Sequence, residues 1–259
     1  MRLLLSCLLL LSACTQSDAA IEEAQSACAT RLFEGSRFTV CQAKGGKVEV
    51  RTSGSSGPYR SFSALQAALG KRADKVAFAM NAGMFDENGN AIGLLVEQGK
   101  QFRAINRRKG GGNFHLMPNG VFLVHKSGKA EVVETGRYRP APDIVFATQS
   151  GPMLLIDGEL HPKFEPDGQS RYVRNGVGIK NDGQPVFVIS ESAVSFGKFA
   201  RFLRDRHQVR DALFFDGSVS SLWNSANNRM DSFTDLGPMV VVFRPSAASR
   251  PGRASPARP

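Results

Sequence analysis

Residues 76–86 read VAFAMNAGMFD, a short apolar run that stops abruptly at a polar side chain followed by small residues. Two further runs stop in the same way, VFVISES (residues 186–192) and ALFFDGS (residues 212–218). The pattern is typical of a buried strand that delivers a polar group to the edge of a sheet, where glycine permits a tight turn. Asn81 or Asp216 alone is read as a turn cap, but three such strand ends favour a shared pocket.

Similar short runs, separated by Gly, Asn and Pro, fill the chain around these three and predict strands. They are Val76–Met80, Gly93–Glu97, Val121–Val124, Glu131–Val133, Ile144–Thr148, Val177–Ile179, Val186–Ile189, Leu213–Phe215 and Met239–Phe243. Upstream, Ser36–Ala43 and Lys47–Thr52 alternate on either side of Gly45-Gly46, which predicts a β-hairpin.

Helical patterns are few. Phe196 to His207 carries apolar residues at i, i+3, i+4 and i+7, and Ser63 to Leu69 has capping-box spacing at its start and Gly70 at its end. Many strands, few helices and no regular alternation of the two predict an α+β fold with a largely antiparallel or mixed β-sheet core.

Composition excludes several classes of protein. Of the 259 residues, 42% are hydrophobic and 22% charged, so the chain has enough apolar material for a core and is not disordered throughout. The net charge of +10 favours an anionic partner, whether nucleic acid, a membrane surface or a phosphorylated substrate. Residues 245–259 hold three of the arginines in a Pro/Ala/Ser-rich context, which predicts a disordered basic tail.

The N-terminus predicts export. Met1-Arg2 precedes a leucine-rich run that is too short to span a bilayer and has the length of a signal-peptide core. The run ends in Leu-Ser-Ala-Cys (residues 11–14), which resembles a bacterial lipobox, so we expect cleavage before Cys14 and lipidation of that residue. The alternative is an ordinary secretory signal cut near Ala13 or Ala19.

The expected organisation is therefore a signal peptide at 1–13, a tether at 14–30, a domain at 31–244 and the tail at 245–259. The predicted location is the bacterial cell envelope, with the lipid in a membrane and the domain facing the periplasm. Cys28 and Cys41 remain as an even pair in an oxidising compartment, so we expect a disulfide between them, with two buried thiols as the alternative.

Four segments carry a resemblance to a known family. NAGMF (81–85), SGPML (150–154), RNGVG (174–178) and DGSVSS (216–221) occur in the order and approximate spacing of the phosphodiester glycosidase family, which includes the lysosomal uncovering enzyme. The resemblance covers roughly residues 74–243, and the last motif is similar to a bacterial branch with Asp-Gly-Ser-x-Ser-Ser. It implies a hydrolase that cleaves a sugar-1-phosphodiester at the glycosidic carbon.

The resemblance also implies site residues. Asp216, Arg174 and Asn81 fall on positions that look like active-site residues, with Asp216 as nucleophile or base and Arg174 near the leaving phosphate. Glu191 is the best candidate for a second carboxylate. The expected substrate-binding positions are Gly83, Ser150, Asn175, Gly217, Ser220 and Ser221.

Other patterns weigh less. His115, His125, His161 and His207 have no metal-ligand spacing, so we expect no metal and no cofactor. A basic run between residues 100 and 109 is first read as a solvated mobile loop and second as a lid. The expected partners are a glycosyl phosphodiester or phosphorylated glycan and, through the lipid, a membrane, but not nucleic acid. The alternative function is a non-catalytic envelope glycan-binding lipoprotein.

Overall fold

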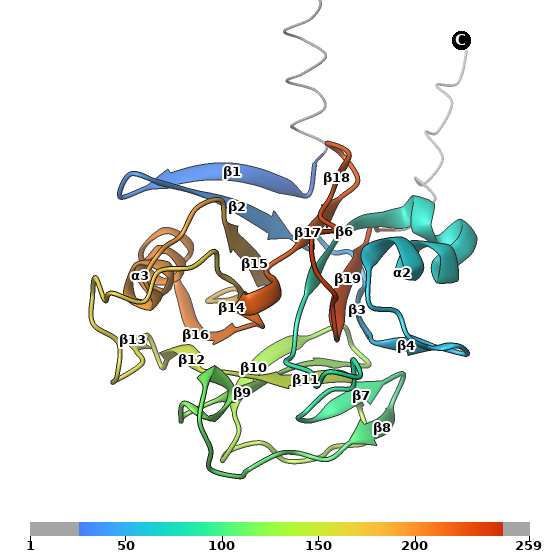
Figure 1. The fold of residues 1–259 in the computed structure, drawn as a ribbon, viewed down its shortest axis with the longest axis horizontal. Coiled ribbons are helices and arrows are strands. Elements are labelled where there is room, and N and C mark those ends of the chain that lie inside the picture. Colours follow the sequence, from blue (N-terminus) through green and yellow to red (C-terminus); the bar gives the residue numbers. More distant parts are fainter. Residues whose placement is uncertain (1–25, 246–259) are drawn as a thin grey trace, which may run out of the picture.

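The computed structural model describes residues 26–245 (Figure 1). The expected signal peptide, the lipidation site Cys14 and residues 246–259 of the tail lie outside this range. The described part is built from three large β-sheets and one two-stranded sheet, in which every pair of neighbouring strands is antiparallel, together with two α-helices. The predicted α+β class with a largely antiparallel core is therefore confirmed. No helix among residues 26–245 is long and apolar enough to cross a membrane.

The first sheet has seven strands in the order β1-β2-β15-β14-β16-β12-β13. Their bounds are β1 Cys28–Phe33, β2 Ser36–Gln42, β15 Pro185–Ser190, β14 Asn175–Lys180, β16 Val209–Phe214, β12 Met153–Ile156 and β13 Glu159–Leu160. Helix α3 (Phe196–His207) packs on one face, as its apolar periodicity predicts. Its Phe199 and Phe202 are buried there, and the Phe202 ring stacks on that of Phe38 with centroids 4.1 Å apart.

The second sheet has the order β10-β9-β11-β7-β8 and lies at the opposite end of the view from β1 (Figure 1). Its strands are β10 Ala130–Glu134, β9 Gly120–His125, β11 Ile144–Ser150, β7 Leu95–Glu97 and β8 Lys100–Arg103. A 3-10 turn, η2 (Asn113–His115), precedes β9. Strand β8 forms one edge of this sheet, and all four of its residues are exposed.

The third sheet has the order β18-β17-β6-β19-β3. Its strands are β18 Arg229–Met230, β17 Leu222–Asn224, β6 Val76–Asn81, β19 Met239–Phe243 and β3 Val48–Arg51. Helix α2 (Phe62–Leu69) and the 3-10 turn η1 (Gly70–Lys75) precede β6, and a small hairpin of β4 (Ser53–Gly54) and β5 (Gly57–Pro58) precedes α2. Phe62 and Leu65 bury the inner face of α2 against this sheet.

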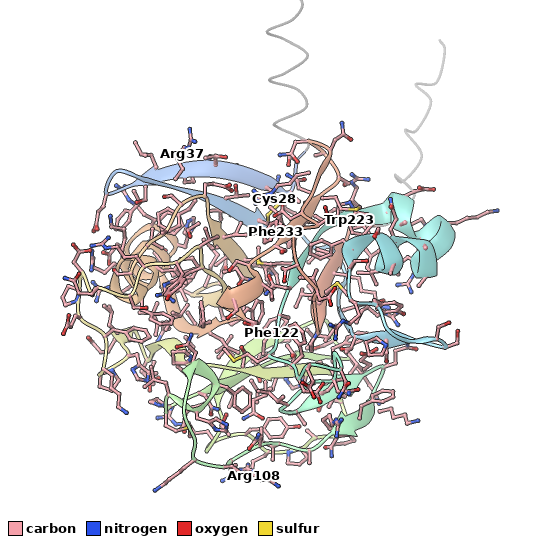
Figure 2. The ribbon with its side chains drawn as sticks, viewed as in Figure 1. Cys28, Arg37, Arg108, Phe122, Trp223 and Phe233 are labelled. Carbon is pink, nitrogen blue, oxygen red and sulfur yellow. A yellow bond between two sulfur atoms is a disulfide. The ribbon has the colours of Figure 1, made fainter. Side chains whose placement is uncertain are left out.

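The three sheets meet at a cluster of phenylalanine rings. Phe78 comes from the third sheet, Phe122 from the second, Phe187 from the first and Phe215 from the end of β16, and all four are fully buried. Ring centroids lie 5.5 to 6.3 Å apart, in edge-on arrangements that aromatic quadrupoles favour. Phe122 lies near the centre of the molecule (Figure 2). This shared core fixes the strand ends of the three sheets relative to one another.

The predicted hairpin between residues 36 and 52 is wrong, although both of its strands exist. β2 pairs with β1 and β15, whereas β3 pairs with β19 in another sheet. Gly46 instead allows a close backbone approach, because a Cβ there would lie 2.0 Å from the carbonyl oxygen of Phe243. The true hairpin joins β1 to β2 through Glu34 and Gly35, both with positive φ.

Two predicted boundaries also move. Strand β1 begins at Cys28, so the folded domain starts before residue 31 and the expected tether is shorter. Helix α2 takes Ser61, not Ser63, as its N-cap, and the Ser61 hydroxyl accepts a hydrogen bond from Ala64 N–H. Cys28 faces Cys41 in the register of β1 and β2, and a disulfide joins them.

Candidate active site

The predicted polar strand ends come together where the three sheets meet. Asn81 ends β6 of the third sheet, Ser150 ends β11 of the second, Asn175 begins β14 of the first, and Asp216 follows β16. Backbone hydrogen bonds join these ends: Asp216 N–H donates to the Ala82 carbonyl, and Asn81 N–H donates to the Ser221 carbonyl. Together with the bond from Asn175 Nδ2 to the Asn81 carbonyl, they connect the ends of β6, β14 and β16, whereas a pocket shared by these ends stays a prediction.

Asn81 is the centre of the polar network. Its side chain is buried, and its amide Nδ2 donates to the carbonyl oxygen of Asp216 at 2.7 Å. Its Oδ1 accepts from Asn175 Nδ2 and from Ser221 N–H, both at 2.8 Å. Every polar atom of this side chain thus holds another segment of the site, so Asn81 is a structural support for the loop that carries Asp216.

The loop after β16 is short and tightly held. Residues Gly217–Val219 form a 3-10 turn (η3), and the Asp216 carboxylate accepts from Ser218 N–H at 3.1 Å. The Ser220 hydroxyl is 3.1 Å from both Asn175 Oδ1 and the Val173 carbonyl. Gly217 must be small, because a Cβ there would lie 2.2 Å from the ring of Phe214. This turn leaves Asp216 half-buried rather than sealed in the core.

The electrostatic setting of Asp216 differs from that of a surface carboxylate. Burial raises the pKa of Asp216 above its usual range, and hydrogen bonds from Ser218 only partly offset this rise. Among residues 26–245, no lysine, arginine or histidine forms an ion pair with it. A carboxyl group whose pKa is raised by burial holds a proton more readily than a surface carboxylate, which is a property of groups that exchange protons in active sites.

Arg174 is also brought to this region, but it is buried. Only 1% of it is exposed, and burial lowers its pKa to about 10, so it keeps its charge at neutral pH. Its guanidinium carbon lies 3.5 Å from the ring centroid of Phe196 and 5.5 Å from that of Phe214. Nε donates to the Val194 carbonyl, and Nη2 donates to the carbonyl and hydroxyl of Ser170. These contacts form an aromatic enclosure around a cation.

No carboxylate in the described chain neutralises Arg174, which is unusual for a buried charge. The ring of Phe214 contacts the Arg174 guanidinium and also limits the space beside Gly217, so one ring supports both the cation and the Asp216 turn. Sequence reasoning missed Phe196 and Phe214 as partners of Arg174. Apolar spacing marks both phenylalanines only as core. Ser190, at the polar end of the VFVISES run, also contacts this residue, because its hydroxyl accepts from the backbone N–H of Arg174 at 2.9 Å.

Glu191 does not join the Asn81 network. Its Oε1 accepts from Thr39 Oγ1 at 2.5 Å and pairs with Arg229 Nη1 at 2.8 Å. Arg229 also pairs with Asp231. The ion pair of Glu191 with Arg229 therefore links the end of β15 to β18. Glu191 makes no hydrogen bond to Asp216.

Gly83 and Ser150 mark the contact between the second and third sheets. A Cβ on Gly83 would lie 2.2 Å from Thr148 Oγ1 and 2.7 Å from the Gln149 carbonyl, so only glycine fits there without a shift. Ser150 is fully buried, and its hydroxyl has no hydrogen-bond partner among residues 26–245. Both positions belong to the packing between the two sheets next to the site. Neither forms a hydrogen bond to Asp216 in the described chain. Within that range, no three His, Cys, Asp or Glu side chains gather as metal ligands.

The fold is shared with solved structures. The catalytic domain of zebrafish N-acetylglucosamine-1-phosphodiester alpha-N-acetylglucosaminidase superposes with a TM-score of 0.57 at 17% identity, over 85% of this chain and 82% of that one. A hypothetical protein from Synechocystis gives 0.53 at 14% identity, over 84% of this chain and 61% of that one. At these identities the likeness defines a class of fold.

The sequence defines the family. Residues 74–243 match the sequence profile of phosphodiester glycosidases, and the chain belongs to that family. The protein YigE of Escherichia coli K12, which is uncharacterised, is 38% identical over 149 residues. That match covers 58% of each chain, so this protein spans little more than half of that relative.

Proposed function

We propose that this protein is a hydrolase that cleaves the glycosidic bond of a sugar-1-phosphodiester. The observation that carries the proposal is Asp216: a half-buried carboxyl group with a raised pKa, held by Asn81 where three sheets meet. Family membership supports the reaction class, since these segments are the ones that resemble phosphodiester glycosidases.

The proposed step breaks the bond between the anomeric carbon and the phosphate oxygen. Ionised Asp216 either attacks that carbon or takes a proton from the attacking water, and the electron pair of the broken bond leaves with the phosphate. Water supplies the hydroxyl of the released sugar and the proton balance, while the phosphate keeps its other ester. Phosphate is a good leaving group, and the buried charge of Arg174 favours its departure electrostatically.

The proposed setting is the bacterial cell envelope. The lipobox-like sequence before Cys14 supports a lipid-anchored lipoprotein with its domain in the periplasm, and a disulfide between Cys28 and Cys41 suits an oxidising compartment. The proposed substrate is therefore a phosphodiester in an envelope or extracellular glycan or glycolipid, and nucleic acid is not a proposed partner.

The test is hydrolysis of matched substrates. We would incubate the purified protein with the methyl phosphodiester of N-acetylglucosamine, the group named for the zebrafish relative, and with other sugar-1-phosphodiesters and plain aryl glycosides. Asp216→Asn is the variant, and Asp182→Asn, in the exposed turn between β14 and β15, is the matched control. We expect cleavage of phosphodiesters only, lost in Asp216→Asn and kept in Asp182→Asn. Full activity of Asp216→Asn would refute the proposed role.

One observation favours a second candidate function, a non-catalytic glycan-binding lipoprotein. Glycosidases commonly use two carboxylates, and here Glu191 is engaged by Arg229 and Thr39. Calorimetry with sugar-1-phosphodiesters separates the two candidates. Binding without turnover by the folded wild-type protein would select the binding module.

A further inference from the structure

A second feature of the molecule lies on the sheet that holds β8, outside the Asp216 site. The segment from residue 100 to residue 109 contains five cations: Lys100, Arg103, Arg107, Arg108 and Lys109. All five are exposed, and none forms an ion pair with a carboxylate among residues 26–245. Five cations within ten residues and no carboxylate partner in the described chain leave a concentrated positive charge on this part of the surface.

Two guanidinium groups converge within this region. Arg107 Nη2 lies 3.4 Å from the carbonyl oxygen of Tyr138, and Arg139 Nη1 lies 2.9 Å from the same oxygen. Arg139 also donates to the Gly136 carbonyl. Two like charges that share one neutral acceptor repel each other, and an anion placed between them would relieve that repulsion through the remaining forked N–H groups.

The loop that carries these cations is anchored rather than loose. Asn106 N–H donates to Gln149 Oε1 at 2.9 Å, and Gln149 Nε2 donates to the Asn106 carbonyl at 2.7 Å. Asn106 Oδ1 then accepts from Arg108 N–H, and His115 Nδ1 is 2.9 Å from the Arg108 carbonyl. The backbone is therefore held in place while the charged side chains extend into solvent, which reduces the entropy lost when a ligand binds.

The placement of the surface indicates what it faces. Arg108 lies at one end of the molecule, and Cys28 and Arg37 lie at the other end (Figure 2). The surface is thus directed away from the end at which the described chain begins. Phe102, 51% exposed beneath Lys100, adds the only large exposed hydrophobic side chain among residues 100–112. Such a strip of cations with a single apolar ring suits a hydrated chain better than a lipid surface, which would favour more buried apolar area.

We propose that Arg107, Arg139, Arg108 and Lys109 form a binding surface for a phosphate-bearing glycan chain, with the Arg107–Arg139 pair as its main contact. Lys100 and Arg103 extend this basic surface along the exposed edge of β8. Among residues 26–245, no hydrogen bond or ion pair joins these cations to Asp216, and binding of a polymer here does not require its hydrolysis.

The experiment measures binding of a fluorescent phosphorylated dextran, with unmodified dextran of the same length as the neutral probe. We expect the wild type to bind only the phosphorylated chain at about 50 mM salt and to lose affinity as salt rises. Arg107→Gln/Arg139→Gln should weaken binding at least about tenfold, because both forked contacts are removed. Arg31→Gln/Arg37→Gln, two exposed arginines at the other end, makes the same change in net charge and should leave affinity within about twofold.

A second variant guards against misfolding. The side chains of Arg108 and Lys109 donate no hydrogen bond within the described chain, so Arg108→Gln/Lys109→Gln should unfold like the wild type and still weaken binding. If Arg31→Gln/Arg37→Gln weakened binding as much as Arg107→Gln/Arg139→Gln, the proposal would be overturned, since net charge alone would then explain the affinity. Absence of wild-type binding to phosphorylated dextran would overturn it too, as would tighter binding to phosphatidylglycerol vesicles that depends on the same arginines.

Discussion

Replacing Asn81 with alanine removes the side chain on which the site depends. Its amide donates to the Asp216 carbonyl and accepts from Asn175 Nδ2 and Ser221 N–H. After truncation, the Ser221 N–H loses its partner, whereas the Asp216 carbonyl keeps the Val219 N–H at 3.3 Å and Asn175 Nδ2 keeps the Asn81 backbone carbonyl at 2.9 Å. One backbone donor, the N–H of the buried Ser221, is therefore left unpaired, and the Asp216 carbonyl loses the shorter of its two hydrogen bonds.

The expected cost follows from this count. A buried unpaired group costs about 1–3 kcal/mol, so Asn81→Ala should lower the free energy of unfolding by about 1–3 kcal/mol. A typical domain has about 5–15 kcal/mol in total, so the change is large. Asn81→Asp keeps both acceptor roles and loses only the donor. The Asn81→Asp variant should become more stable relative to the wild type as pH falls, because only a protonated carboxyl group can donate a hydrogen bond to the Asp216 carbonyl.

The assay is urea unfolding followed by circular dichroism, with the disulfide intact. Asn181→Ala is the matched control, because Asn181 is exposed in a turn and its side chain makes no hydrogen bond within the described chain. We expect the control to stay within about 0.5 kcal/mol of the wild type. A change equally small for Asn81→Ala would refute the claim that this amide holds the three strand ends together.

Three further predictions concern the same region and the disulfide. Asp216→Asn should stabilise the fold increasingly as pH rises. The pKa of Asp216 is raised in the folded state, so the stability of the wild type is greatest below the pKa of the unfolded chain and falls as pH rises through the pKa of the folded protein. Urea unfolding at several pH values checks this, and a pH-independent difference would contradict it. Gly217→Ala should cost about 1–3 kcal/mol and displace the Asp216 turn, because the new Cβ meets the Phe214 ring; unchanged melting and activity would count against it. Replacing Cys28 and Cys41 with serine should cost about 2–4 kcal/mol, and an unchanged urea midpoint would show that strand pairing alone suffices.

The strand positions follow from local pattern. Val76–Met80 and Val186–Ile189 are short apolar runs bounded by turn residues, and both are strands in the structure. Helix α3 likewise begins at Phe196 and ends at His207, as its periodicity predicts. The two strands are buried on both faces and therefore form continuous apolar runs, whereas the helix is buried on one face and therefore has a helical period.

Strand pairing does not follow from local pattern. Ser36–Ala43 and Lys47–Thr52 look like the two arms of a hairpin, yet β2 and β3 join different sheets. Alternation says which side of a strand is buried but not which strand lies beside it, and that choice depends on the packing of distant phenylalanines in the shared core.

The sequence by itself determined the class of fold and the family motifs, and it predicted Asn81, Asn175 and Asp216 as site residues, because strand ends and small residues leave a local signature. Tertiary structure alone decided what these groups do. It made Asn81 a support for the Asp216 loop, enclosed Arg174 in aromatic rings, and committed Glu191 to Arg229. Burial and charge pairing are properties of neighbours in space, so no stretch of the chain records them on its own.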